Sequence, residues 1–155
     1  MSGSTGRAWS FAVLVAAVVL AGDQLTKHLI KSSIPDGDHR DLIPGLQLVH
    51  ATNDGVAFSV SAGGPTLVLI VIGIAVAAIV GYFATHHDRP LIWLPTGMMV
   101  GGAVGNLVDR IRLGAVTDFI KLPHWPAFNL ADTSITLGVV ALLFVLRDDG
   151  SPSTR

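Results

Sequence analysis

An uncharged run of 20 residues, 65–84, limits what this chain can fold into more than any other feature of its sequence. The run reads PTLVLIVIGIAVAAIVGYFA. An α-helix rises roughly 1.5 Å per residue, so a helix of this length matches the ~30 Å hydrocarbon core of a bilayer. The run therefore predicts a membrane-spanning helix.

The composition extends this prediction to the whole chain. Half of the residues are hydrophobic and only 14% are charged, against about 25% charged in typical soluble domains. We expect one integral membrane domain, 1–155, of four transmembrane helices. The spans are predicted at about 9–30, 65–84, 91–108 and 129–146, and the external loops at 31–64 and 109–128. The apolar start at 9–22 also resembles a cleavable signal peptide, although the spans that follow favour a first helix.

The loop 31–64 carries signals of a small sheet. Leu46-Gln47-Leu48 alternates, Asn53-Asp54-Gly55 offers a turn, and Val56-Ala57-Phe58 resumes. An Asp-Gly turn flanked by β-formers is typical of a hairpin. The predicted fold class is therefore an all-α membrane protein with a small extracytoplasmic β-sheet cradle between helices 1 and 2.

Two of the predicted helices carry small residues at helical spacing. Gly97, Gly101 and Gly105 recur every fourth residue in the third span, and Gly73, Ala77 and Gly81 do the same in the second. Small residues at this spacing let helices approach closely in lipid. Both faces are predicted to pack against neighbouring helices.

Four antiparallel spans put both termini on one side of the membrane and both long loops on the other. The terminal side carries Arg7, Arg89, Arg147 and Arg155. The loop side carries Lys27, Lys31, Arg40, Arg110, Arg112 and Lys121. The positive-inside rule would place the larger set in the cytoplasm. We nevertheless predict cytoplasmic termini, because several loop-side cations lie beside a polar cluster and have a role there.

This cluster lies where the third and fourth spans meet the loop between them. Its members are Asn106, Asp109, Arg110, Asp118, Asn129 and Asp132. Residues three or four apart share a helix face, so packing the two helices side by side brings the cluster to one membrane edge. Placing a carboxylate at such an edge costs free energy unless the group is paired, hydrated or part of a functional site.

The cluster allows several interpretations. The chain has no Cys, which excludes thiol nucleophiles, and paired carboxylates fit acid–base chemistry. Asn129 and Asp132 also suit helix caps, Asp109 and Arg110 suit a surface ion pair, and Asp23 and Lys27 suit an i,i+4 pair. Asp-rich clusters can hold hard cations, but no spacing here is diagnostic. No metal or cofactor is predicted.

Five segments together give a specific resemblance. They are DQLTK at 23–27, NDGVAF at 53–58, GGAVGNLVDR at 101–110, VTDFI at 116–120 and FNLAD at 128–132. In order and in placement relative to the spans, the chain resembles the lipoprotein signal peptidases, the type II signal peptidases of bacteria. The loop between Asp118 and Asp132 is short for that family.

The resemblance implies an aspartic endopeptidase of the bacterial cytoplasmic membrane, with its active site at the extracytoplasmic face. It would cut diacylglyceryl-modified prolipoproteins just before the lipidated cysteine, with Asp118 and Asp132 as the catalytic pair. The substrate-binding or supporting positions would be Asp23, Lys27, Asn53, Asn106, Asp109, Arg110 and Asn129. The implied partners are the lipidated substrate, membrane lipid and a globomycin-type inhibitor. We expect a monomer, and the net charge of -1 argues against nucleic acid as a partner.

Two rival functions remain at this point. A small proton-coupled transporter would need charges near mid-bilayer in several spans, whereas the second span has none. A non-catalytic scaffold would explain the glycines but not the paired aspartates.

Overall fold

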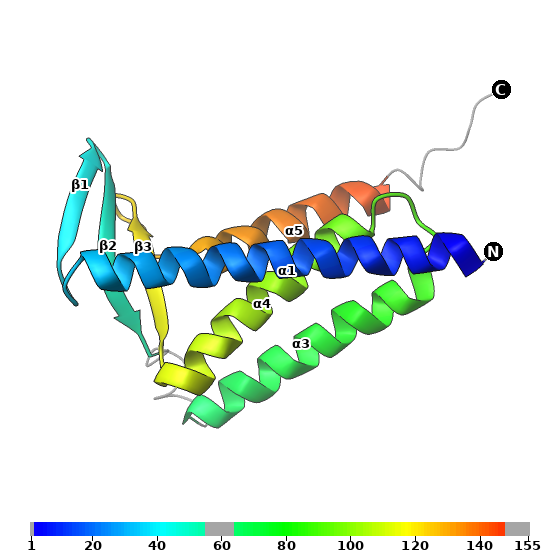
Figure 1. Ribbon diagram of the computed structural model, residues 1–155, viewed down its shortest axis with the longest axis horizontal. Coiled ribbons are helices and arrows are strands. Elements are labelled where there is room, and N and C mark those ends of the chain that lie inside the picture. Colours follow the sequence, from blue (N-terminus) through cyan, green and yellow to red (C-terminus); the bar gives the residue numbers. More distant parts are fainter. Residues whose placement is uncertain (1, 55–63, 148–155) are drawn as a thin grey trace.

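The computed structural model describes residues 2–54 and 64–147, which form four helices and a three-stranded antiparallel sheet. The helices are α1 (Ser2–Ser33), α3 (Gly64–His86), α4 (Trp93–Leu113) and α5 (Leu130–Arg147). The strands are β1 (His39–Ile43), β2 (Leu46–Asn53) and β3 (Val116–Lys121). The sheet closes one end of the helical bundle, and α1 begins and α5 ends at the opposite end (Figure 1).

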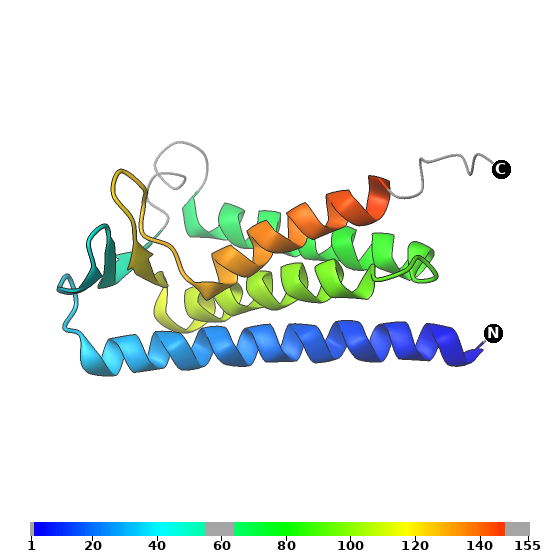
Figure 2. The ribbon, with the colours of Figure 1, turned by 90° about the horizontal axis from the view of Figure 1, so that it is seen from above.

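The helix α4 is the centre of the bundle, because it contacts α1, α3 and α5 (Figure 2). Its glycine face confirms the packing prediction for the third span. A Cβ built on Gly97 would lie 2.6 Å from Ala12 O, and one on Gly101 would lie 2.6 Å from Ala16 O. Any larger side chain there would push α1 away, so the close approach of the two helices depends on glycine.

The corresponding prediction for the second span is wrong. A Cβ on Gly73 or Gly81 would meet no atom within 4 Å among the described residues. The helix α3 instead packs through large side chains at the end of the bundle remote from the sheet. Phe83 is fully buried there beside Ala12 and Ile92, and its ring meets Trp9 edge-on at 4.8 Å.

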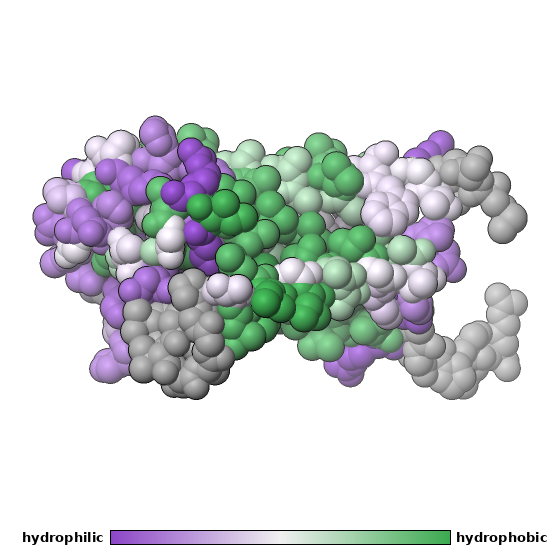
Figure 3. Space-filling view, turned by 90° about the horizontal axis from the view of Figure 1, so that it is seen from below, coloured by the Kyte–Doolittle hydropathy of each residue, from purple (hydrophilic) through white to green (hydrophobic). Residues whose placement is uncertain are grey.

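Three helices are long and apolar enough to cross a membrane: Thr5–Ser33 within α1, Thr66–His86 within α3, and α5. The helix α4 is not one of them, since its glycines and its polar residues Asn106, Asp109 and Arg110 dilute its hydrophobicity. The fourth crossing therefore stays a prediction. On the face that Figure 3 shows, an apolar belt does cross the middle of the molecule between hydrophilic ends.

The sheet differs from the predicted cradle in its origin. Only β1 and β2 lie between the first two predicted spans; β3 comes from the segment between α4 and α5. The predicted start of the external loop 109–128 is thus wrong, because α4 continues to Leu113. The rest of that segment contains the strand β3. The two predicted loops do lie together, since β2 pairs with β3.

The hairpin turn also differs from the prediction. Strand β2 includes the expected Leu46–Leu48, but its hairpin partner is β1, and the chain reverses at Pro44-Gly45. Gly45 has φ +86°, which glycine adopts without strain. Asn53 is the last residue of β2, and the expected continuation at 56–58 lies outside the described residues.

Candidate active site

The turn from α4 into β3 places Asp118. Gly114 ends α4 with φ +77°, and its N–H donates to Arg110 O. The chain then pairs with β2 in a register that puts Ala51 opposite Asp118 and Asn53 opposite Val116. Asn53 Nδ2 donates to Asp118 Oδ2 at 3.0 Å. The strand pairing therefore brings a residue from the first loop to the carboxyl group of Asp118.

Asn129 joins Asp118 to Asp132. Phe128 bridges back to Ile120, so the chain enters α5 beside β3. Asn129 Oδ1 accepts from the Asp132 N–H at 2.9 Å, and Asp132 Oδ2 accepts from the Asn129 N–H at 3.2 Å. These reciprocal bonds form a capping box. Asn129 Nδ2 also donates to Asp118 Oδ1 at 2.7 Å, so the predicted cap and the predicted site are one structure.

Asn106 makes the second connection to the pair. Its Nδ2 donates to Asp132 Oδ1 at 2.8 Å, while its Oδ1 accepts from Asn129 Nδ2 and from Lys27 Nζ, each at 3.0 Å. Two donors fix the oxygen end of the amide, so its nitrogen end must face Asp132. Both oxygens of Asp132 are thereby held.

Lys27 is the most buried cation of the site, with 1% of its surface exposed. Its ammonium has three acceptors: Asp23 Oδ2 at 2.8 Å, Asp109 Oδ2 at 3.1 Å and Asn106 Oδ1 at 3.0 Å. Three acceptors satisfy the three N–H donors of an ammonium group. The i,i+4 pair of Asp23 and Lys27 is confirmed, but it belongs to a larger network between α1 and α4.

Two carboxylates of that network bind backbone N–H groups of neighbouring elements. Asp23 Oδ1 accepts from the Ala131 N–H at 3.0 Å, at the positive end of the α5 dipole. Asp109 Oδ2 accepts from the Thr117 N–H at 3.2 Å, next to Asp118. Asp109 therefore pairs with Lys27 and not with Arg110. In the part of the chain that the structure describes, every buried side-chain nitrogen and oxygen atom has a hydrogen-bond partner.

Gln24 belongs to the site although the sequence did not single it out. Its Nε2 donates to Asp109 Oδ1 at 3.0 Å and to Gly105 O at 3.2 Å. Its position next to Asp23, in the DQLTK segment, was the available signal. Helix geometry gave no further signal, because adjacent residues such as Asp23 and Gln24 do not lie on the same helix face.

Burial distinguishes the two aspartates. Asp118 is 2% exposed, whereas Asp132 is half-buried. Burial raises the pKa of Asp118 to about 6, against the lowering effect of the Asn53 hydrogen bond and with a further rise from the negative charge of Asp132. Asp118 can thus hold a proton at a pH where an ordinary carboxyl group has lost it.

Arg110 lies beside the site without touching either aspartate of the pair. Its Nη1 donates to Asn106 O at 3.3 Å, and it lines a small cavity of about 120 Å³ with Asp54 and Leu69. Within the described residues its guanidinium has no carboxylate within 4.0 Å.

No metal site accompanies the pair in residues 2–54 and 64–147, where no group of three or more His or Asp side chains is arranged to hold an ion. A cavity of about 740 Å³ lies at the tip of the sheet, between Asp41–Gln47 and Lys121–His124. Neither Asp118 nor Asp132 lines that cavity. The aspartate pair itself therefore marks the candidate active site.

Comparisons with known proteins cover all of these residues. Residues 15–147 match the family model described as signal peptidase (SPase) II. The lipoprotein signal peptidase of Moorella thermoacetica is 40% identical, over 86% of this chain and 91% of that protein. The one of Pelotomaculum thermopropionicum is 36% identical, over 94% of this chain and 97% of that protein. A solved structure described as a bacterial membrane enzyme superposes with a TM-score of 0.81 at 31% identity, covering 87% of this chain and 91% of its own.

Proposed function

This chain belongs to the signal peptidase II family and so removes signal peptides from prolipoproteins, and we propose that it does so as an aspartic endopeptidase with Asp118 and Asp132 as its catalytic pair. The observation that carries the proposal is the double connection of the two carboxyl groups through Asn129 and Asn106. Segments far apart in the sequence converge to hold these two carboxyl groups in place.

The two aspartates take different roles in the proposed reaction. Asp118, whose pKa is about 6, is the acid that donates a proton to the carbonyl oxygen of the scissile bond. Asp132 is more open to water, so its carboxylate can meet the attacking water molecule. It removes a proton from the attacking water. Collapse of the tetrahedral intermediate breaks the C–N bond: Asp118 takes back a proton from one hydroxyl group as the carbonyl re-forms, and the proton held by Asp132 passes to the leaving nitrogen.

The proposed substrate is a prolipoprotein whose cysteine already carries diacylglycerol, cut on the amino side of that cysteine. A diacylglycerol anchor fixes the depth of the scissile bond at the edge of the hydrocarbon core. Asp118 lies in β3 and Asp132 in the first turn of α5, at the end of the bundle that the sheet closes (Figure 1). The bond and the carboxyl groups would therefore meet at the same depth.

The proposed topology has four crossings, with both termini in the cytoplasm and the sheet with the aspartate pair outside, in the bacterial cytoplasmic membrane. The helix α4 supplies the fourth crossing, since it is enclosed by the three apolar helices. A reporter inserted at 33–40 should read external, and one at the C-terminal tail should read cytoplasmic. The reverse pattern would overturn the orientation.

We further propose that the enzyme acts as a monomer and binds a globomycin-type cyclic peptide at the aspartate pair. The buried charges of the site pair within one chain, since Lys27 binds both Asp23 and Asp109. A proton-coupled transporter is not favoured. In residues 2–54 and 64–147 the buried charged side chains gather at the sheet end, namely Asp23, Lys27, Asp109 and Asp118. The helix α3 has no Lys, Arg, Asp or Glu along its length, so these residues offer no relay of charged side chains across the bundle.

The experiment that tests the catalytic pair is cleavage of a lipidated and an unlipidated precursor by purified variants. Asp118→Asn and Asp132→Asn keep the shape but cannot exchange a proton, and each should slow cleavage at least about 100-fold. The double variant should be hardly slower than either single one, because the pair acts as a unit. A folded single variant that cuts near the parent rate would refute the mechanism.

A further inference from the structure

The excess of cations at the sheet end has an explanation beyond the reaction. Four of the six loop-side cations have partners within the protein. Lys27 is in the buried network, Arg40 donates to Ser33 O at 2.7 Å, Arg110 to Asn106 O, and Lys121 to Trp125 O at 2.9 Å. Lys31 and Arg112 remain. In the described part of the chain neither has a carboxylate within 4.0 Å or a side-chain hydrogen bond.

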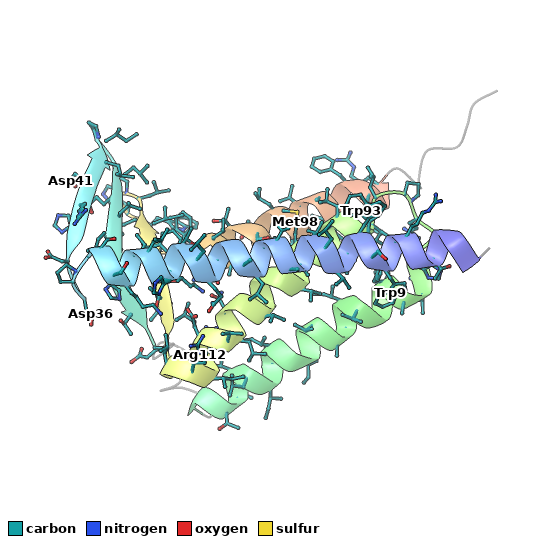
Figure 4. The ribbon with its side chains drawn as sticks, in the orientation of Figure 1. Trp9, Asp36, Asp41, Trp93, Met98 and Arg112 are labelled. Carbon is teal, nitrogen blue, oxygen red and sulfur yellow. The ribbon has the colours of Figure 1, made fainter. Side chains whose placement is uncertain are left out.

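These two unpaired cations line one cavity. It has a volume of about 180 Å³, lies between α1 and α4, and is lined by Gln24, His28, Lys31, Asp109, Arg112 and Leu113. Arg112 lies at the sheet end of α4 (Figure 4). The carboxylate on the cavity wall, Asp109, shares Lys27 with Asp23, so these three groups leave one negative charge against the two positive charges of Lys31 and Arg112. The cavity therefore presents net positive charge to an incoming group.

The surroundings of the cavity are apolar and exposed. Leu25 and Leu29 on α1 are 58% and 52% exposed, and Ile111 and Leu113 on α4 are 68% and 55% exposed. These side chains belong to α1 and α4, the two helices that form the cavity. A ligand bound here would need an anionic group to pair with the two cations and an alkyl part to contact the exposed leucine and isoleucine side chains.

We propose that this cavity binds the phosphate of an anionic glycerophospholipid. Basic pockets between membrane helices bind such headgroups. Each Lys or Arg near the membrane surface adds roughly the same electrostatic attraction for an anionic lipid. The ligand is not the proposed substrate, because a diacylglyceryl cysteine carries no phosphate. The proposal depends only on the protein being embedded in lipid and is independent of the assignment of the catalytic pair.

The test is lipid binding by the full chain in detergent, measured by native mass spectrometry. The ligands are phosphatidylglycerol, phosphatidylcholine and inorganic phosphate. The variants are Lys31→Gln, Arg112→Gln and both together. Arg147→Gln, an exposed arginine at the far end of α5, is the matched control for loss of a cation at a membrane edge. Helical content is compared by circular dichroism.

Phosphatidylglycerol should occupy one saturable site, and its Kd should rise about fivefold for each cation removed. Arg147→Gln should bind like the parent, and phosphatidylcholine should bind more weakly. Equal losses in the double variant and in Arg147→Gln would overturn the site. Displacement of the lipid by an equal concentration of inorganic phosphate would show a phosphate-ion site and overturn the lipid assignment. Equal affinity for the two lipids would overturn the preference for an anionic headgroup.

Discussion

The side-chain amide of Asn129 lies 2.7 Å from Asp118 Oδ1, and the same side chain caps the helix that carries Asp132. Helix α5 thus begins at the point that positions the candidate catalytic pair. A change at Asn129 affects two properties: the stability of the helix start and the placement of Asp118. Different substitutions can separate them.

Asn129→Ser should keep the cap and lose the connection to Asp118. Serine caps helices about as well as asparagine, so we expect Asn129→Ser to lose only the buried amide hydrogen bonds, at about 1–3 kcal/mol, together with a loss of cleavage of about 100-fold from misplacement. Asn129→Ala should lose cleavage and also the cap, at about 1 kcal/mol more. Thermal unfolding and a cleavage assay measure the two effects. Full activity of Asn129→Ser would make Asn129 only a cap.

Cleavage should fall as the pH rises above about 6, because Asp118, with its pKa of about 6, then loses the proton that it donates in the proposed mechanism. Asn53 lowers that pKa by donating to the carboxylate. Asn53→Ala should therefore raise the pKa and move the alkaline limb of kcat/KM upward by about one pH unit.

Thr52→Ala is the matched control for this shift, because Thr52 lies on the same strand and bonds the exposed Asp36 instead. Its pH profile should coincide with that of the parent. The alkaline limb of kcat/KM reports ionisation in the free enzyme. Its apparent pKa belongs to the two coupled aspartates together. An unchanged limb in Asn53→Ala would show that Asn53 does not tune Asp118.

Lys27→Met should destabilise the protein by about 3–5 kcal/mol, since it leaves Asp23 and Asp109 buried without their cation. Lys31→Met removes the same charge one turn later, where the side chain is exposed, and should stay within about 0.5 kcal/mol. Apparent melting temperatures in one detergent give the comparison. Similar melting temperatures for the two variants would contradict the role of the buried network.

Gly101→Ala should destabilise the contact of α1 and α4, because the added Cβ would lie 2.6 Å from Ala16 O. Overpacking of this kind costs about 1–3 kcal/mol. Gly81→Ala meets no atom within 4 Å among the described residues and should be neutral or slightly stabilising through helix propensity. Melting temperatures that fall equally for both would contradict the packing.

Several parts of this structure follow from local sequence. Hydropathy and length predicted the helices, and the four-residue spacing of Gly97 and Gly101 predicted a close contact. The i,i+4 spacing of Asp23 and Lys27 predicted their ion pair. These features depend on residues near one another along the chain, so periodicity is enough to reveal them. The same spacing misled at Gly73 and Gly81, because periodicity shows that a face can pack but not whether a neighbour lies there.

Only the tertiary structure decided which distant groups meet. Strand β3 pairs with β2, and this pairing delivers Asn53 to Asp118. Asp109 pairs with Lys27 and not with its sequence neighbour Arg110. The glycine face of α4 lets α1 approach closely enough for this ion pair to form. Sequence by itself determined which polar residues the chain carries and on which helix faces they lie. Close packing of the helices decided their partners, because a buried charge must find its counter-charge across space and not along the chain.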